Sequence, residues 1–125
     1  MTADHDDVRV IVVDDNRDEA ESLGALLAIN GYTVRTTTST AEVIDEVVRW
    51  RPHCVMLDID MPGMDGIELS RRLRAAADED LVVIAVTGWG PASQVFSEDF
   101  VHIDHCLRKP VDPAQLARLL PPIDR

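Results

Sequence analysis

The amino-acid sequence predicts an α/β protein of the (βα)₅ type, in which a parallel sheet is covered by helices on both faces. Three observations support this prediction. Short apolar runs rich in β-branched residues alternate along the chain with segments whose apolar residues recur at helical spacing. The runs are continuously apolar, which indicates strands buried on both faces, as in parallel sheets. Capping residues stand before most of the helical segments.

The strands and helices alternate along the whole chain. The strands are expected at Val8–Val13, Tyr32–Thr36, Cys54–Leu57, Val82–Val86 and His105–Arg108. The helices are expected at Ala20–Ile29, Ala41–Trp50, Gly66–Ala77, Ala92–Val101 and Pro113–Leu120. The segment 92–101 has the weakest helical pattern, because Gly88, Gly90 and Pro91 precede it and no glycine ends it.

Capping signals support the other four helices. An acceptor stands three residues before an acid or amide in the pairs Asn16/Glu19, Ser39/Glu42, Asp65/Glu68 and Asp112/Gln115. This is the spacing of a capping box or of a close variant. Pro113 falls at a first helical position, and Asn30-Gly31 stands where the first helix should end on a left-handed residue.

Composition limits the classes of function. The 125 residues, 46% of them hydrophobic, predict one globular domain over 1–125 with a core of about 8–120 and no effector domain. A formal net charge of -11 repels nucleic acid and anionic lipid, so neither is expected as a partner. The acidic N-terminus does not resemble a secretory signal, and the longest apolar run, 81–86, is too short to cross a bilayer. A cytoplasmic location is therefore expected.

Acidic and hydroxyl side chains directly follow three of the expected strands. Asp14 and Asp15 come after the first strand, Asp58 after the third and Thr87 after the fourth. In an open parallel sheet the ligand site lies beyond the carboxyl ends of the strands, where strand order reverses. If the first and third strands are neighbours, three carboxylates converge there, and like charges so close call for a cation. Oxygen ligands favour a hard divalent ion, Mg²⁺, with Mn²⁺ as the alternative.

The same residues suit phosphoryl transfer. Carboxylate attack on phosphorus gives an aspartyl phosphate, which is a recognised form of nucleophilic catalysis. Lys109 follows the short fifth strand and can bring a positive charge to phosphate oxygens, while the Thr87 hydroxyl can donate a hydrogen bond. The sequence therefore predicts a phosphoryl site at one edge of the sheet.

Four motifs in this order resemble those of response-regulator receiver domains, the phosphoacceptor domains of two-component systems and phosphorelays. They are Val12-Val13-Asp14-Asp15-Asn16, the run from Met56 to Gly66, Val86-Thr87-Gly88 and Leu107-Arg108-Lys109-Pro110. The resemblance covers the chain from Val8 to about Leu120. The segments Thr87–Gly90 and Lys109–Pro113 look most like receivers attached to hybrid sensor kinases.

The resemblance implies a flavodoxin-like fold with strand order 2-1-3-4-5. It implies that Asp58 accepts a phosphoryl group from a sensor histidine kinase or a histidine phosphotransfer protein. Mg²⁺ would be held by the acidic pair Asp14 and Asp15, by Asp58 and by the backbone carbonyl of Asp60. Such a domain catalyses only its own phosphorylation and dephosphorylation, and it signals by a change of shape.

The resemblance also assigns the residues around the phosphoryl group. Thr87 and Lys109 would grip it, and Gly88 would keep its pocket open. The Lys109–Pro110 peptide bond would be cis. A downstream protein would be contacted through the face formed by the segment 92–101 and the strand that follows it.

Three features depart from the family pattern. Cys106 stands where the family often has Tyr or Phe, so the usual coupling of threonine to an aromatic ring has no ring here. His102 stands where a glycine commonly ends the fourth helix. Asp60 and Trp89 each follow a phosphoryl-site residue by two positions, and we expect them to flank the path of the hydrolytic water and to set the lifetime of the signal.

Two other functions fit parts of the sequence. Asp58-Ile59-Asp60 after an apolar strand also resembles the first motif of haloacid-dehalogenase-type phosphatases, in which one Asp is the nucleophile and the second the acid or base. The preceding acidic pair and the lack of room for a cap argue against that enzyme. A receiver-like module that binds partners without phosphorylation is the other alternative, and the absence of an aromatic side chain at Cys106 is the feature that supports it.

Overall fold

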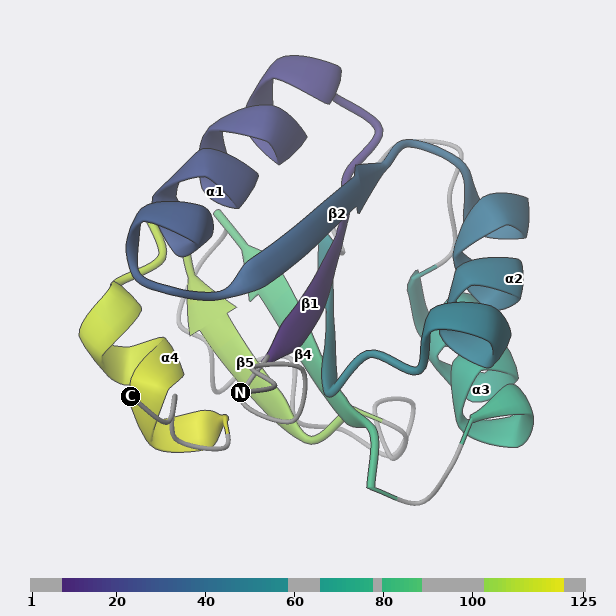
Figure 1. Cartoon of the computed structure of the whole chain (residues 1–125). Coiled ribbons are helices and arrows are strands. Elements are labelled where there is room, and N and C mark those ends of the chain that lie inside the picture. Colours follow the sequence, from purple (N-terminus) through teal and green to yellow (C-terminus); the bar gives the residue numbers. More distant parts are fainter. Residues whose placement is uncertain (1–7, 59–65, 78–79, 89–102, 121–125) are drawn as a thin grey trace.

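The computed structural model describes residues 8–58, 66–77, 80–88 and 103–120, which form five strands and four helices. The strands are β1 (Arg9–Val13), β2 (Thr33–Thr37), β3 (Cys54–Asp58), β4 (Val82–Thr87) and β5 (His105–Arg108). The helices are α1 (Arg17–Ile29), α2 (Thr40–Trp50), α3 (Gly66–Ala76) and α4 (Pro113–Leu119). Figure 1 shows them as a central sheet between helices.

All five strands form one parallel sheet in the order β2-β1-β3-β4-β5. This confirms the flavodoxin-like fold and its strand order. The three central strands are buried along almost their whole length, as the uninterrupted apolar runs predict. Strand order reverses between β1 and β3, so the carboxyl ends of these two strands mark the ligand-binding edge of the sheet.

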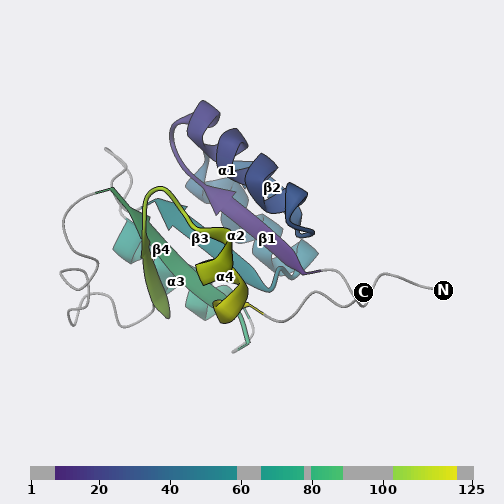
Figure 2. The same ribbon diagram turned by 90° about the vertical axis from the view of Figure 1, so that its left-hand side faces the viewer.

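Two hydrophobic layers cover the faces of the sheet. On one face α1 and α4 pack through Ala20, Leu27 and Leu116. On the other face α2 and α3 pack through a second cluster that includes Val43 and Leu73. Figure 2 shows α1 and α4 on the near side of the sheet, with α2 and α3 behind it. The sheet is therefore held from both sides, and its carboxyl edge is left for polar residues.

The first two helices begin directly after their predicted caps, one to three residues before the first apolar residue of each helical pattern. The Asn16 side chain accepts a hydrogen bond from Glu19 N, and Ser39 accepts one from Glu42 N, so α1 begins at Arg17 and α2 at Thr40. The expected start of the first helix at residue 20 was therefore too late. Gly31, with φ of 100°, ends α1 as expected.

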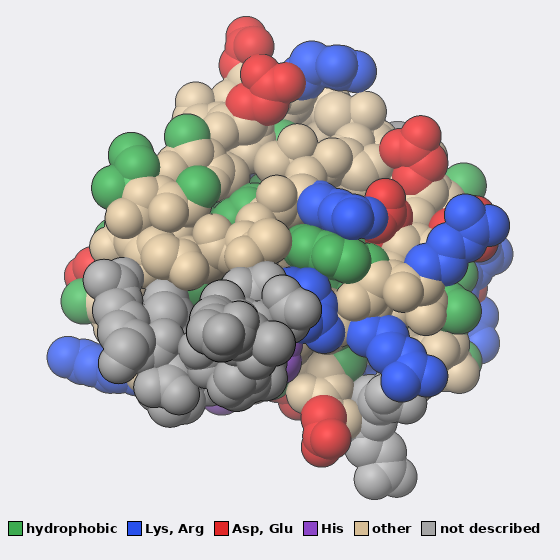
Figure 3. Space-filling view, viewed as in Figure 1, with side chains coloured by type: hydrophobic (Ala, Val, Ile, Leu, Met, Phe, Trp, Pro, Cys, Tyr) green, Lys and Arg blue, Asp and Glu red, His purple; other side chains and the backbone are tan. Residues whose placement is uncertain are grey.

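The edge strand β2 is polar and is tied to α2 by Arg35. The Arg35 guanidinium lies 2.6 Å from a Glu46 carboxylate oxygen and 4.3 Å from the centre of the Trp50 ring. Figure 3 shows basic side chains gathered over this part of the molecule. A charged side chain on an edge strand opposes pairing with another sheet, so this arrangement protects the exposed edge.

The expected helix over 92–101 and its end at His102 lie outside the described residues, as do Asp60 and Trp89. Among the helices that the structure describes, none combines the length and apolarity that crossing a bilayer requires.

Gly24 lets α1 approach β2, and this contact gives a test of the packing. A Cβ at position 24 would lie 2.9 Å from the Thr36 methyl carbon, which is closer than van der Waals contact. Overpacking costs about 1–3 kcal/mol, whereas Gly→Ala in a helix gains about 1 kcal/mol. We expect Gly24→Ala to lower the free energy of unfolding in urea by about 1 kcal/mol.

The control is the same change in a Thr36→Ser background, which lacks the methyl group. There Gly24→Ala should be neutral or stabilising. An equal loss of stability in both backgrounds would show that this contact does not set the spacing between α1 and β2.

Candidate functional site

Strand register brings the predicted acids together. Val13 of β1 pairs with Leu57 of β3, so the next residues, Asp14 and Asp58, emerge side by side at the carboxyl edge. Both residues are buried, with relative exposures of 5% and 6%. The predicted convergence of Asp14 and Asp58 is therefore present in the fold.

The neighbouring strands add a hydroxyl and an ammonium group. Asp58 pairs with Val86 of β4, which places Thr87 one residue further along the same edge. Thr87 is 1% exposed, and its carbonyl accepts a hydrogen bond from Lys109 N at 2.8 Å. The Lys109–Pro110 bond is cis, the geometry that the family resemblance implies.

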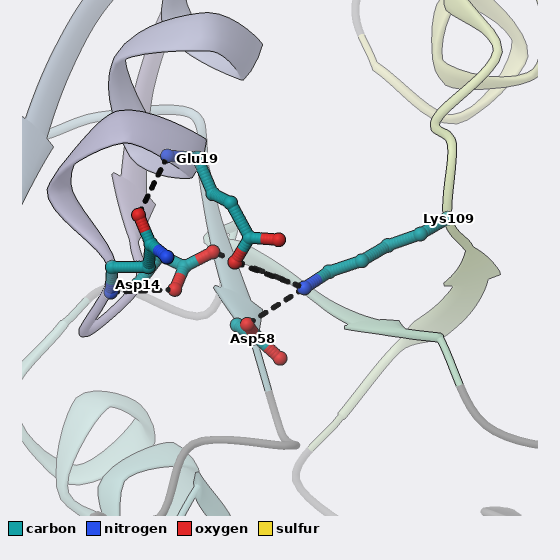
Figure 4. Close-up of polar contacts among 5 residues, drawn as sticks. Asp14, Glu19, Asp58 and Lys109 are labelled. Atoms are coloured by element: carbon teal, nitrogen blue, oxygen red, sulfur yellow. Dashed lines mark hydrogen bonds and ion pairs between the residues drawn. The ribbon is translucent and has the colours of Figure 1, made fainter.

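The Lys109 ammonium lies among three carboxylates (Figure 4). Its Nζ is 2.8 Å from Asp58 Oδ2, 3.7 Å from Glu19 Oε2 and 3.9 Å from Asp14 Oδ2. The shortest contact is a hydrogen bond in which Lys109 donates to Asp58. One positive charge is thus shared by three acids, and the nearest of them is the predicted phosphoacceptor.

Asn16 connects the end of β1 to the start of α1. Its backbone N–H donates to Asp14 Oδ1 at 3.0 Å, and its side-chain oxygen accepts from Glu19 N at 3.1 Å. The first bond orients the Asp14 carboxylate, and the second sets the first turn of α1. Together they bring Glu19 to the same edge as Asp14 and Asp58.

Burial and charge alter the acidity of two site residues. Burial, together with the nearby charge of Asp58, raises the pKa of Asp14 to about 6, against the opposing effects of the Asn16 N–H and of Lys109. Partial burial tends to lower the pKa of Lys109, but the hydrogen bond and charge of Asp58, with Asp14 and Glu19, outweigh it and raise that pKa. Lys109 therefore stays protonated, whereas the ionised form of Asp14 is destabilised by its burial and by the nearby charge of Asp58.

A cavity of about 660 Å³ opens beside these groups. Asp14, Glu19, Asp58, Gly88 and Lys109 line its polar part. Its apolar part lies between α1 and the segment that precedes α4, where the lining is Leu23, Leu26, Pro110 and Val111. The acids are thus open to small ions and to a reacting phosphoryl group.

Not every predicted residue joins the cluster. Asp15 is exposed and is not among the carboxylates whose oxygens lie within 4.8 Å of one another, which are Asp14, Glu19 and Asp58. Cys106, on β5, is half-buried and packs on the apolar layer formed by α2 and α3.

Glu19 is the site residue that the sequence analysis missed. Its place in the capping pair with Asn16 explained it fully as a helix-start residue. The same spacing puts Glu19 in the first turn of the helix that follows Asp14, and this was the available signal.

The donor set fits a divalent cation. Asp14 and Asp58 are buried carboxylates, and among the described residues within 4 Å of them Lys109 is the positively charged side chain. Three carboxylates against one ammonium leave a surplus of negative charge, which carboxylate-binding ions such as Mg²⁺ offset. Asp14, Asp58 and Glu19 each have a carboxylate oxygen within 4.8 Å of the other two, and Asp15 directly follows Asp14 in the chain.

Comparisons with known proteins agree with this geometry. Residues 10–120 match the family model described as response regulator receiver domain. Response regulator MprA of Mycobacterium sp. (strain KMS) is 38% identical over 103 residues, which cover 82% of this chain and 44% of that protein. This chain thus spans less than half the length of such relatives.

Solved structures show the same fold. A CheY-like receiver domain from Methylobacillus flagellatus superposes with a TM-score of 0.78 at 24% identity, over 90% of this chain and 95% of that one. TrrA of Thermotoga maritima, solved in complex with Mg²⁺ and BeF, gives 0.75 at 25% identity, over 89% and 94%.

The chain belongs to the response regulator receiver domain family. It is a receiver domain of the two-component response regulator class, and its cluster of acids is consistent with a phosphoacceptor site. The phosphatase alternative is not favoured, because both the family match and the relatives are response regulators.

The pKa of Asp14 predicts how the metal-free domain responds to pH. Because this pKa is about 6 in the folded chain against an ordinary value of 3.8, protonated Asp14 contributes stability that is present below about pH 4 and is lost as the pH rises through 6. Asp14→Asn, which keeps an oxygen for the Asn16 N–H, should therefore raise the free energy of unfolding at pH 7.5 by on the order of 2 kcal/mol.

Urea unfolding with a chelator present, at several pH values, measures this difference. The gap between variant and wild type should close toward pH 4, and saturating Mg²⁺ should reduce it at pH 7.5. A gap that stays constant across this pH range would contradict the assignment.

Proposed function

We propose that Asp58 is the phosphoacceptor of this receiver domain and that its donor is a phosphohistidine of a sensor histidine kinase or histidine phosphotransfer protein. The hydrogen bond from Lys109 to Asp58, beside the buried Asp14, is the observation that supports this best. Because of this hydrogen bond, an Asp58 oxygen lies next to the Lys109 ammonium, which is able to pair with phosphoryl oxygens.

The reaction is a transfer between two nucleophiles. An Asp58 carboxylate oxygen attacks phosphorus, an O–P bond forms, the N–P bond of the phosphohistidine breaks, and imidazole leaves with the electron pair. Lys109 pairs with the transferred oxygens, and the Thr87 hydroxyl, at the adjacent strand end, donates to one of them. Hydrolysis later breaks the O–P bond, releases phosphate and restores the carboxylate.

A divalent cation completes the site, Mg²⁺ with Mn²⁺ as an alternative. When bound, it offsets the charge of the acids and of the phosphoryl oxygens. Asp14, Asp15 and Asp58 are the proposed ligands, with the backbone carbonyl of Asp60. Asp14 and Asp58 are preplaced by strand register, whereas Asp15 must turn toward the same edge from its exposed position.

Phosphorylation changes the contacts at the ends of β4 and β5. Before transfer Lys109 donates a hydrogen bond to Asp58. After transfer Lys109 and Thr87 both contact the phosphoryl oxygens instead. Cys106 stands where the family usually has an aromatic ring, so in this proposal the change is transmitted through the backbones of β4 and β5. Beyond the paired residues of these strands, the Lys109 N–H donates a hydrogen bond to the Thr87 carbonyl. The output is a protein contact at the face of β5 and the segment 92–101.

The lifetime of the phosphorylated state depends, in this proposal, on Asp60 and Trp89. Their positions in the sequence support this role, because Asp60 follows Asp58 by two residues and Trp89 follows Thr87 by two residues. The indole shields the path of the attacking water, and the carboxylate repels or orders that water. Trp89→Ala should shorten the half-life of the phosphorylated domain, and an unchanged dephosphorylation rate would remove Trp89 from this role.

The cellular setting follows from the same proposal. A phosphohistidine donor of this kind acts in the cytoplasm, and we propose that location for the domain. The segments Thr87–Gly90 and Lys109–Pro113 support attachment to a hybrid sensor kinase, whereas the relatives described above are response regulators. The neighbouring coding sequence distinguishes a receiver that acts alone from one joined to a kinase or to an output domain.

Intact-mass measurement after incubation with a small phosphodonor and Mg²⁺ tests the function. The wild type should gain one phosphoryl group and then lose it, and Asp58→Asn should gain none. Chelation of divalent ions should abolish the gain. The matched control is Asp45→Asn, which removes an equal charge from the middle of α2.

Two results would contradict the proposal. A mass gain that persists in Asp58→Asn would move the acceptor elsewhere, and no gain in the wild type would favour an interaction module that acts without phosphorylation. Sustained catalytic hydrolysis of a phosphomonoester would instead support the phosphatase alternative.

A further inference from the structure

Glu19 stands at the mouth of the acidic site. Its side chain is 53% exposed, whereas those of Asp14 and Asp58 are 7% exposed, yet its Oε2 lies only 3.7 Å from Lys109 Nζ. It also lines the cavity that opens beside these groups. Glu19 is therefore the most exposed of the three acids around the lysine, and it borders the cavity beside the site.

The position of Glu19 is built into the fold. Asn16 accepts a hydrogen bond from the Glu19 backbone N–H, so this residue is held in the first turn of α1. The same Asn16 donates to Asp14, which ties the helix start to the buried acid. Figure 4 shows the Glu19 carboxylate directed from α1 toward Lys109 and Asp58. A glutamate that served only to cap the helix could instead extend into solvent.

The charge of Glu19 acts differently on the two reactants of the proposed function. The three carboxylates of Asp14, Glu19 and Asp58 outnumber the single Lys109 ammonium among them, and their oxygens lie within 4.8 Å of one another. A divalent cation is attracted by the additional acid. A small anionic phosphodonor at Asp58 lies close to the same acid, and it is repelled in proportion to its own charge.

We propose that Glu19 is a specificity-determining residue that strengthens cation binding and slows the phosphorylation of Asp58 by small dianionic phosphodonors. This inference rests on the proposed function. A free acyl phosphate brings only its charge to the site, whereas a protein donor also brings a contact surface whose binding free energy offsets the repulsion. Glu19 thus favours a protein-bound phosphohistidine over a small free phosphodonor.

The test compares Glu19→Gln with the wild type at saturating Mg²⁺, using acetyl phosphate as a dianionic donor and phosphoramidate as a monoanionic one. The variant should be phosphorylated about 3- to 10-fold faster by acetyl phosphate, and its advantage with phosphoramidate should be roughly the square root of that factor. Both advantages should shrink when the ionic strength is raised to about 1 M.

Cation binding gives a readout that is independent of phosphorylation. Calorimetric titration with Mg²⁺ alone should show about 2- to 5-fold weaker binding to Glu19→Gln. The matched control is Glu21→Gln, which changes the net charge equally on the same helix but does not line this cavity. It should leave the Mg²⁺ affinity and both donor rates near the wild-type values. Glu19→Asp, which keeps the charge, should retain most of the discrimination between donors.

Each outcome distinguishes a separate failure. Equal acceleration with both donors would overturn the proposal, because it would mean that Glu19 acts by restraining Lys109. Unchanged donor rates and Mg²⁺ affinity in Glu19→Gln would also overturn it. If the wild type is not phosphorylated at Asp58 at all, the proposed function fails, and the Mg²⁺ titration still decides whether Glu19 contributes to the cation site.

Discussion

The gathering of acids around Lys109 is the interaction on which the site depends. Asp14 and Asp58 are buried where the sheet ends, and a single ammonium lies between them and Glu19. Buried like charges are costly, which is why burial and Asp58 raise the pKa of Asp14. A divalent cation relieves this imbalance and also offsets the negative charge of an incoming phosphoryl group, so the folded chain is prepared to bind both together.

The apolar layers hold the acids in place. β1 and β3 are buried between α1 and α4 on one side and α2 and α3 on the other, and their register fixes Asp14 beside Asp58. The hydrophobic free energy of these layers offsets the cost of the charged edge. The functional residues thus lie where the strands leave the core. Glu19 adds a negative charge to that edge while its side chain stays exposed.

Much of this could be predicted from the sequence. Uninterrupted apolar runs predicted a sheet covered on both faces, and acids placed directly after two of them predicted the site. Apolar runs carry no information about which strands are neighbours, so the strand order came from the family resemblance. The starts of the first two helices were placed one to three residues too late, because their caps, such as Asn16, precede the first apolar residues, whereas the starts at Gly66 and Pro113 were correct. Glu19 escaped notice because a capping pair explains it fully, and only the folded first turn of α1 reveals its second role.

Anomalous diffraction from crystals grown with Mn²⁺ tests the central claim most directly, since it locates the ion without relying on phosphorylation. The claim predicts one strong peak within roughly 2.0–2.3 Å of a carboxylate oxygen of Asp58, with Asp14 or Asp15 as a further ligand and Lys109 displaced from its place against Asp58. Peaks only at scattered surface acids, with the Lys109 to Asp58 hydrogen bond intact, would contradict it.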